Sequence, residues 1–276
     1  MIEKILRKFS DFKGKQRIAR ILLKNKIQNN TDLIVAGKYN CQYKVPNIKE
    51  TIGFELYING IYEPEIINFI TSRIPKEGIL IDIGANIGAI CIPMCRNRPD
   101  IKTIAIEASP RVYCYLEFNK TANNLSNCNI INKAVTDSKI KTIDFFSPFE
   151  SFGKGSLENV ITSNSEKVET ISLDSLFMQN DVGPESFIKV DIEGHEYAAF
   201  KSGENVLNKS EAPNILFEFV DWAENSTQNY KAGDAQKLLM DYHYTLYELK
   251  TGGRLERMSH PLEEGSAMIY ATKKPL

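Results

Sequence analysis

From residue 78 onward, short apolar runs alternate with helically patterned segments. The runs are rich in β-branched residues and predict buried strands at 78–84, 101–107, 128–135, 186–192, 214–220, 244–249 and 266–272. The intervening segments predict helices at 87–96, 110–123, 196–206 and 234–240. Strands separated by helices build a mostly parallel sheet covered on both faces, so we expect a three-layer, Rossmann-like α/β fold of seven strands. The closing strand–loop–strand predicts an antiparallel last strand.

Two prolines bear on the expected helices. Ser109 followed by Pro110 is typical of a helix start, with Ser109 as the N-cap and Pro110 at the first helical position. Pro93 lies inside the helix expected at 87–96 and predicts a kink there. Between the third and fourth strands, residues 139–170 predict two further strands around a loop.

The chain before residue 78 is less regular. Residues 28–50 are polar and predict a linker or a loose pair of strands, whereas residues 51–58 (TIGFELYI) predict a strand. Pro64 suits the first turn of a helix. Residues 1–27 carry apolar side chains at helical spacing, interrupted near Gly14. We therefore expect a basic N-terminal helical segment and linker over 1–50 and one domain over 51–276.

Charge is distributed unevenly along the 276 residues. The net charge of −1 excludes a globally basic nucleic-acid binder. Residues 1–27 hold nine Lys or Arg against Glu3 and Asp11, which is +7 and leaves −8 on the remainder. This segment suits an amphipathic arm that contacts anionic lipid, nucleic acid or a partner. The favoured alternative is a helix that packs on the domain and turns its basic face to solvent.

Cysteine usage and hydropathy bear on where the protein works. Five cysteines, an odd number in a chain of this length, do not predict a disulfide framework and favour reduced thiols. No run reaches the roughly 18 uncharged apolar residues of a membrane span, and the basic N-terminus lacks the apolar region of a secretory signal. These features predict a cytoplasmic protein.

The turn from Asp82 to Gly88 follows the first strand of the expected sheet. Glycines at 84 and 88 allow a tight turn, which lies at the strand end where open parallel sheets bind ligands. Asn86 stands where a dinucleotide-binding turn needs its second glycine, so a dehydrogenase is not favoured. Asp82, two residues before Gly84, suits a ligand with an ammonium group.

A second acid points to a ribose. Glu107 ends the next strand and can accept hydrogen bonds from both ribose hydroxyls. A ligand with a ribose, a cationic amino-acid end and no bridging phosphates is S-adenosylmethionine. Ala134, at the end of the third strand, would flank the adenine of this ligand. Asp137 is available to the adenine amino group, although a role in the turn is favoured for Asp137.

Titratable groups crowd the end of the fourth strand, from Asp191 to Glu196. Crowded like charges raise a pKa toward neutrality, which suits a general base. Asp191 and Glu193 would share a side if the strand continued. Our hypothesis places Asp191 nearest the amino-acid end of S-adenosylmethionine. Either Glu193 or His195 would face the hydroxyl of a second substrate, the acceptor of the methyl group. The alternative is that residues 193–196 only cap the next helix.

Further candidates surround these two clusters. Glu63, beside Tyr62, is expected to fold over the methionine end of the cofactor, unless it only begins a helix. Trp222 suits stacking on a sugar, with a buried packing role as an equal alternative. Glu218 is a further substrate candidate, and residues 149–156 suit a lid. A divalent metal held by Glu218 and the 191–195 cluster is not favoured, because no spacing is diagnostic.

Several of these motifs together resemble a known family. They are residues 60–65 (GIYEPE), the 82–88 turn, Ile106-Glu107, residues 188–196 (IKVDIEGHE) and residues 217–219 (FEF). Between about 60 and 219, the chain resembles class I, Rossmann-like methyltransferases of the FkbM type. The resemblance implies an S-adenosylmethionine-dependent O-methyltransferase that acts on hydroxyls of sugars, glycans or other small acceptors.

The sequence leaves two alternative functions. One is a nucleic-acid methyltransferase anchored by the basic arm; the −8 remainder and the lack of an Asn/Asp-Pro-Pro-aromatic motif argue against it. The other is a non-catalytic cofactor-binding module, which leaves the acidic cluster at 191–196 unexplained. The acceptor and the oligomeric state are not predicted.

Overall fold

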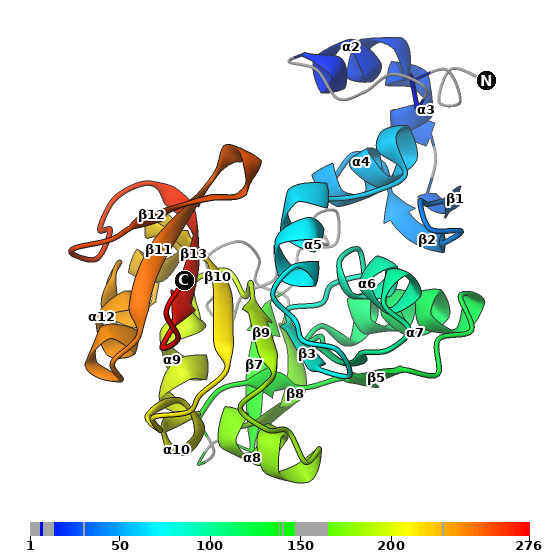
Figure 1. Cartoon of the computed structure of the whole chain (residues 1–276). Helices are drawn as coiled ribbons and strands as arrows, with labels where there is room; N and C mark the ends of the chain where they lie inside the picture. The colour runs from blue at the N-terminus through cyan, green and yellow to red at the C-terminus, as the bar shows by residue number, and fades with distance from the viewer. Residues whose placement is uncertain are drawn as a thin grey trace.

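The computed structural model describes residues 6–7, 14–29, 31–137, 139, 141–146, 165–227 and 229–276. Its centre is an eight-stranded sheet in the order β12-β11-β13-β10-β9-β3-β4-β5 (Figure 1). The strands are β3 (Ile79–Ile83), β4 (Lys102–Ile106), β5 (Cys128–Ile131), β9 (Phe187–Val190), β10 (Asn214–Val220), β11 (Thr245–Lys250), β12 (Arg254–Arg257) and β13 (Ser266–Thr272).

Strand directions confirm the predicted α/β fold. Five adjacent strands of this sheet, β5, β4, β3, β9 and β10, run parallel to one another. The last strand, β13, inserts antiparallel between β10 and β11. The prediction of seven strands is one short, because β12 pairs with β11 through a turn at Thr251–Gly253. β12 is four residues long and three of them are charged, so no apolar run marks it.

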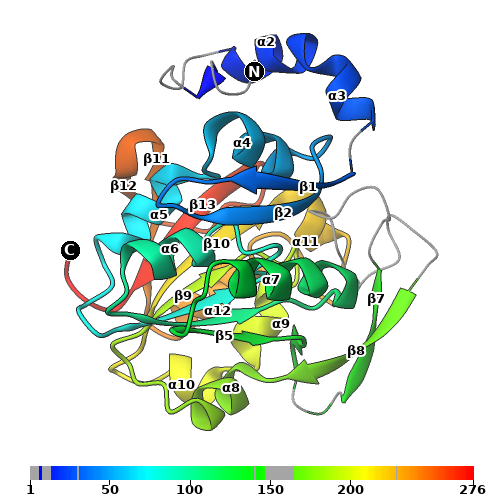
Figure 2. The same cartoon turned by 90° about the vertical axis from the view of Figure 1, so that its right-hand side faces the viewer.

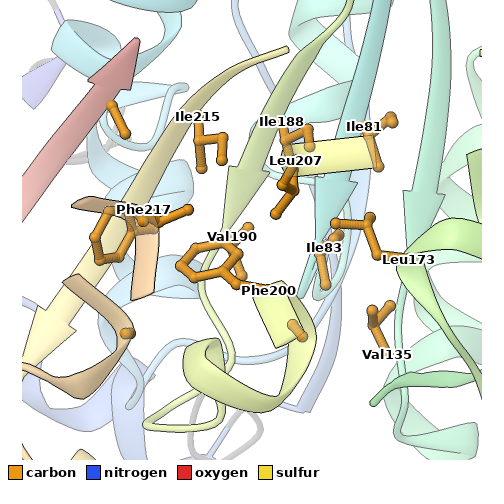
Figure 3. Packing of buried hydrophobic residues seen from close by; sticks show 14 of the residues in the cluster. Ile81, Ile83, Val135, Leu173, Ile188, Val190, Phe200, Leu207, Ile215 and Phe217 are labelled. Carbon is orange, nitrogen blue, oxygen red and sulfur yellow. The ribbon is translucent and has the colours of Figure 1, made fainter. Parts of the chain in front are cut away.

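Helices cover both faces of the sheet. One layer holds α5 (Pro64–Thr71), α6 (Cys91–Asn97) and α7 (Pro110–Ala122). The other holds α8 (Leu173–Gln179), α9 (Glu196–Lys201), α10 (Glu204–Leu207) and α12 (Asp234–Asp241). Figure 3 shows alternate residues of β9 on the helix-covered face, with Ile188 beside Leu207 of α10 and Val190 beside Phe200 of α9. The alternation of strand side chains lets one sheet support both layers.

Helix boundaries agree with the sequence in part. Ser109 caps α7, and its Oγ accepts a hydrogen bond from the Val112 backbone N–H at 3.3 Å, as predicted. α6 starts only at Cys91, so Pro93 lies in its first turn, where helical N–H groups have no intrahelical partner. The predicted interior kink is therefore wrong. The helix expected at 196–206 is divided into α9 and α10.

The N-terminal part forms a separate layer over α7. It comprises α2 (Lys15–Leu22), α3 (Lys24–Asn29), a hairpin of β1 (Thr31–Ala36) and β2 (Gln42–Asn47), and α4 (Thr51–Asn59). Of the two alternatives for residues 28–50, a linker or a loose strand pair, the hairpin is the strand pair. Asn119 of α7 accepts from the Lys44 N–H at 2.6 Å and donates to its carbonyl at 3.1 Å. This side chain thereby takes the place of a neighbouring strand along β2.

Residues 51–58 form helix α4, so the predicted strand is wrong. Phe54, Leu56 and Ile58 are all fully buried, and α4 is apolar on almost every side. Hydropathy periodicity cannot separate such a helix from a buried strand. The helix ends at Gly60, which takes the left-handed backbone conformation with φ of 74°.

Residues 134–171 add a three-stranded sheet of β6 (Ala134–Val135), β8 (Ser165–Ile171) and β7 (Thr142–Phe146). The two strands predicted in 139–170 are present, whereas the strand expected at 128–135 is split between β5 and β6. The lid suggested at 149–156 lies outside the described residues. In the described part of the chain, no helix is long and apolar enough to cross a membrane.

Candidate active site

A cavity of about 240 Å³ opens at the carboxyl ends of β3, β4, β9 and β10. Its wall combines the turns that follow β3, β4 and β9 with residues 133–135, and residues 52, 62 and 63 approach from α4 and the start of α5. Parallel sheets bind ligands at this edge. Of the predicted site residues, nine line the cavity: Glu63, Gly84, Asn86, Glu107, Ala134, Asp191, Glu193, His195 and Glu218.

The turn after β3 depends on glycine for close packing. Gly84 has φ of +78°, and a Cβ there would overlap the carbonyl oxygen of Asp191. The N–H groups of Gly84 and Ala85 both donate to the Ile106 carbonyl at 2.9 Å, which folds the turn over β4. Gly88 does not line the cavity; a Cβ there would press on Ile92. Its predicted cofactor contact is therefore corrected to a packing role.

Glu107 is held in one orientation by main-chain donors. Oε2 accepts from the Asn86 N–H at 2.9 Å, and Oε1 accepts from the Ser109 N–H at 2.8 Å. Burial raises its pKa to about 7, although both hydrogen bonds oppose that rise. Each oxygen keeps a second lone pair toward a cavity that Glu107 lines. The carboxylate can thus accept two hydroxyls of a ligand.

Asp82 is placed differently from the prediction. Its side chain is fully buried and does not line the cavity. Oδ1 lies 3.5 Å from Nζ of Lys189, its register partner on β9. The predicted direct contact with a ligand's ammonium group is therefore corrected: Asp82 reaches the cavity only through Lys189, which lines it.

Lys189 is a site residue to which the sequence analysis assigned no role. Its Nζ lies 3.3 Å from Oδ2 of Asp191 and 3.4 Å from the Gly84 carbonyl, so it joins the turns after β3 and β9. Burial opposes its charge, but Asp191, Asp82 and Glu63 outweigh burial and raise its pKa. A lysine inside an apolar central strand needs a buried anionic partner, and that signal was present in the sequence.

Carboxylates crowd the other side of the cavity. Burial, followed by the charges of Asp191 and Glu193, raises the pKa of Glu218 to about 9. Burial also raises the pKa of Glu63. β9 ends at Val190 and Glu193 takes a left-handed conformation with φ of 52°, so strand alternation does not relate Asp191 to Glu193 as predicted. The turn itself brings both to the cavity.

His195 occupies the N-cap position of α9 and is only 5% exposed. Its Nδ1 lies 2.9 Å from the hydroxyl of Tyr230, a residue with no signal in the sequence. Burial lowers the pKa of His195 to about 4, so its ring is neutral at pH 7. Glu196 accepts from the Ile192 N–H at 3.0 Å and supports the turn before α9, consistent with the helix-capping alternative for that residue.

Besides Asp82 and Gly88, two further predicted residues do not line the cavity. Asp137 is exposed, and its Oδ1 accepts from the Lys139 N–H at 3.0 Å, the arrangement of a turn residue. Trp222 lies on α11 (Asp221–Asn225) and is 54% exposed, so the alternative of a buried packing role is wrong. Neither side chain lines the cavity.

The cavity's chemistry fits a ligand with a cation at one end and a diol at the other. A positive charge beside Glu63 and Glu218 would favour their ionised forms, which burial disfavours, while Glu107 presents its oxygens across the cavity. In the described part of the chain, no group of three or more His, Cys, Asp or Glu is arranged to hold a metal ion.

Residues 82–246 match the family described as the methyltransferase FkbM domain. Hexuronic acid methyltransferase AglP from Haloferax volcanii is 29% identical over 147 residues, which are 52% of this chain. The match spans 58% of the length of that relative.

Two solved structures show more distant similarity. Precorrin-6y C5,15-methyltransferase from Geobacter metallireducens shares 14% identity with a TM-score of 0.44, covering 78% of this chain and 90% of that one. Fibrillarin from Aeropyrum pernix, with S-adenosyl-L-methionine natively bound, shares 12% identity with a TM-score of 0.40, covering 75% and 74%. Both TM-scores are below 0.5, so the fold assignment rests on strand order and the family match.

Proposed function

The chain belongs to the FkbM methyltransferase family, which depends on S-adenosylmethionine, and we propose that it methylates a hydroxyl group of a sugar acceptor. The observation that carries this proposal is the pairing of Glu107, held by two main-chain donors, with an acid-rich wall that contains the neutral His195. The sugar class is supported by the hexuronic acid methyltransferase relative.

Each side of the cavity would bind a different part of the cofactor. Glu107 would accept the ribose hydroxyls, and the turn at Gly84–Asn86 would help to hold the cofactor. Glu63 and Asp191 would hold its cationic end. When bound, S-adenosylmethionine supplies a methyl group on a positively charged sulfur. Positioning of this kind can contribute about 7–11 kcal/mol to a transfer step in favourable cases.

His195 takes the proton from the acceptor hydroxyl. Its ring is neutral at pH 7 and is oriented by Tyr230 at Nδ1. Glu218, with a pKa of about 9, stays protonated at pH 7 and donates a hydrogen bond rather than accepting the proton. Asp191 and Glu193 stabilise the positive charge that His195 acquires. The same acids favour an acceptor with no negative charge beside the reacting hydroxyl.

Transfer of labelled methyl groups tests the function. The full chain is incubated with methyl-labelled S-adenosylmethionine and with oligosaccharides that contain either neutral hexoses or hexuronic acids. We expect label in the neutral sugar, in a form stable to mild alkali, as a methyl ether is. Alkali-labile label would mean a carboxyl ester and would overturn hydroxyl methylation. Absence of label in every acceptor would count against the sugar class.

The role of His195 has its own test. His195→Gln should lower kcat by roughly 10²–10⁴-fold, because a general base contributes about that much, while cofactor affinity stays unchanged. His260→Gln, at an exposed histidine outside the cavity, is the matched control. If His195→Gln keeps full kcat between pH 6 and 9, His195 is not the base.

A further inference from the structure

Helix α2 exposes large apolar side chains on one face. Ile18, Ile21 and Leu22 are 48%, 69% and 54% exposed. Their spacing of three and four residues places them on one side of the helix. Three aliphatic side chains that share an exposed helical face form a patch, unlike the scattered single residues common on protein surfaces.

The opposite face of α2 anchors the helix to the protein. Ala19 and Leu23 are buried in the cluster that contains Phe54 of α4. Arg20 places its guanidinium 4.3 Å from the centre of the Phe54 ring and donates to the Lys49 carbonyl at 3.0 Å. Figures 1 and 2 both show α2 and α3 over α4, at the end of the molecule away from the central sheet. The helix therefore has a fixed inner face and an outer face turned to solvent.

Two exposed cations flank the apolar patch in sequence, within a segment that is basic throughout. Residues 15–29 contain five Lys or Arg and no Asp or Glu. Arg17 and Lys24 are exposed beside the patch. Arg17 lies on α2, and Lys24 begins α3 directly after it. Exposed apolar side chains flanked by cations are what an anionic membrane surface binds. A second copy of the same face would bring like charges together, so self-association through it is disfavoured.

We propose that this outer surface, made of Arg17, Ile18, Ile21 and Leu22 of α2 and Lys24 of α3, docks the protein on an anionic lipid surface. The apolar side chains enter the boundary between headgroups and acyl chains, and the two cations contact lipid phosphates. α4, to which α2 is anchored, also contributes Ile52 to the wall of the cavity. In the docked protein, α2 would contact the lipid, and α4 would lie between α2 and the cavity. The proposal does not depend on methyl transfer.

Vesicle binding by the full chain tests the apolar contribution. We expect sedimentation with vesicles of phosphatidylcholine mixed with phosphatidylglycerol, and little with phosphatidylcholine alone. Ile21→Asp should weaken binding roughly tenfold to a hundredfold, the equivalent of one buried isoleucine. The control is Met178→Asp on α8, which removes an apolar side chain that is 77% exposed elsewhere.

The charge contribution is tested without touching the apolar side chains. Arg17→Gln with Lys24→Gln should weaken binding to the mixed vesicles by roughly fivefold per charge, with the difference shrinking as salt rises. This variant keeps the test valid if Ile21→Asp folds poorly. The proposal is overturned if the unaltered chain does not bind anionic vesicles, or if Ile21→Asp binds them as well as Met178→Asp does. It is also overturned if light scattering shows a dimer that the Ile21→Asp substitution dissociates.

Discussion

The two sides of the cavity differ in how their charges are satisfied. On the side of β3 and β4, Glu107 receives two main-chain hydrogen bonds of 2.9 and 2.8 Å. On the side of β9 and β10, Glu218 has a strongly raised pKa and Lys189 is shared among acids. The first side is preorganised by backbone, which suits binding. On the second side several buried acids crowd around Lys189, an arrangement that suits a cationic ligand and proton transfer.

The largest expected effect comes from Lys189→Met. It leaves Asp82 and Asp191 without their shared cation, and breaking a buried ion pair costs about 3–5 kcal/mol. Lys133→Met makes the same substitution at another cavity lysine, whose 3.1 Å partner Glu169 is 70% exposed. That change should cost about 1 kcal/mol or less. Urea denaturation measures both.

Adding Asp82→Asn to Lys189→Met tests the cause. Removal of the unpaired charge should restore part of the lost stability. If Lys189→Met and Lys133→Met lower the free energy of unfolding equally, or if Asp82→Asn restores no stability, the ion pairs of Lys189 with Asp82 and Asp191 do not stabilise the fold.

A smaller effect is expected where the two sides touch. Gly84→Ala would force a Cβ into the Asp191 carbonyl at a φ of +78°. Gly252→Ala meets the same strain, with φ of +77°, but has open space around it. The control should lose about 1–2 kcal/mol from backbone strain alone, and Gly84→Ala roughly 1–3 kcal/mol more from overlap. Equal losses in thermal unfolding would mean that the two turns do not pack closely.

The pH dependence of stability should report on the buried titratable groups near the turn after β9. Burial raises the pKa of Glu196 to about 8 in the folded state, so the folded chain keeps a proton that the unfolded chain releases above about 4.5. Stability is therefore lost as pH rises toward 8, by about 1.4 kcal/mol per pH unit. His195, with its pKa lowered to about 4, acts oppositely and loses stability as pH falls below about 6.5.

Glu196→Gln separates the two contributions. Between pH 6.5 and 8 it should flatten the decline by roughly 2 kcal/mol, because glutamine can still accept from the Ile192 N–H and has no proton to lose. Denaturant midpoints across this pH range give the answer. An unchanged slope would show that Glu196 does not titrate in the folded protein.

Much of the fold followed from local signals in the sequence. Ser109-Pro110 marked the start of α7, and the apolar runs located the five parallel strands. The 51–58 segment misled because α4 is buried on almost every side, which removes the helical period. β12 was missed because an exposed, charged edge strand has no apolar run.

The site could be predicted only as far as chain order dictates strand ends. Glu107 and Asp191 follow strands directly and His195 lies in the turn after β9, so the parallel sheet brings all three to one edge. Asp82 was misplaced because the sequence does not show that its side chain turns away from the cavity toward Lys189. Tyr230, 35 residues from His195 along the chain, meets it only through the packing of the segment after α11.

Calorimetry of S-adenosylmethionine binding tests the central claim, that the cavity holds this cofactor through Glu107. Glu107→Ala should weaken binding by roughly tenfold or more, since hydrogen bonds to a charged group are worth about 1.5–3 kcal/mol each. Glu117→Ala, at an exposed position on α7, should leave binding unchanged. No binding by the unaltered protein, or equal binding by it and Glu107→Ala, would contradict the account.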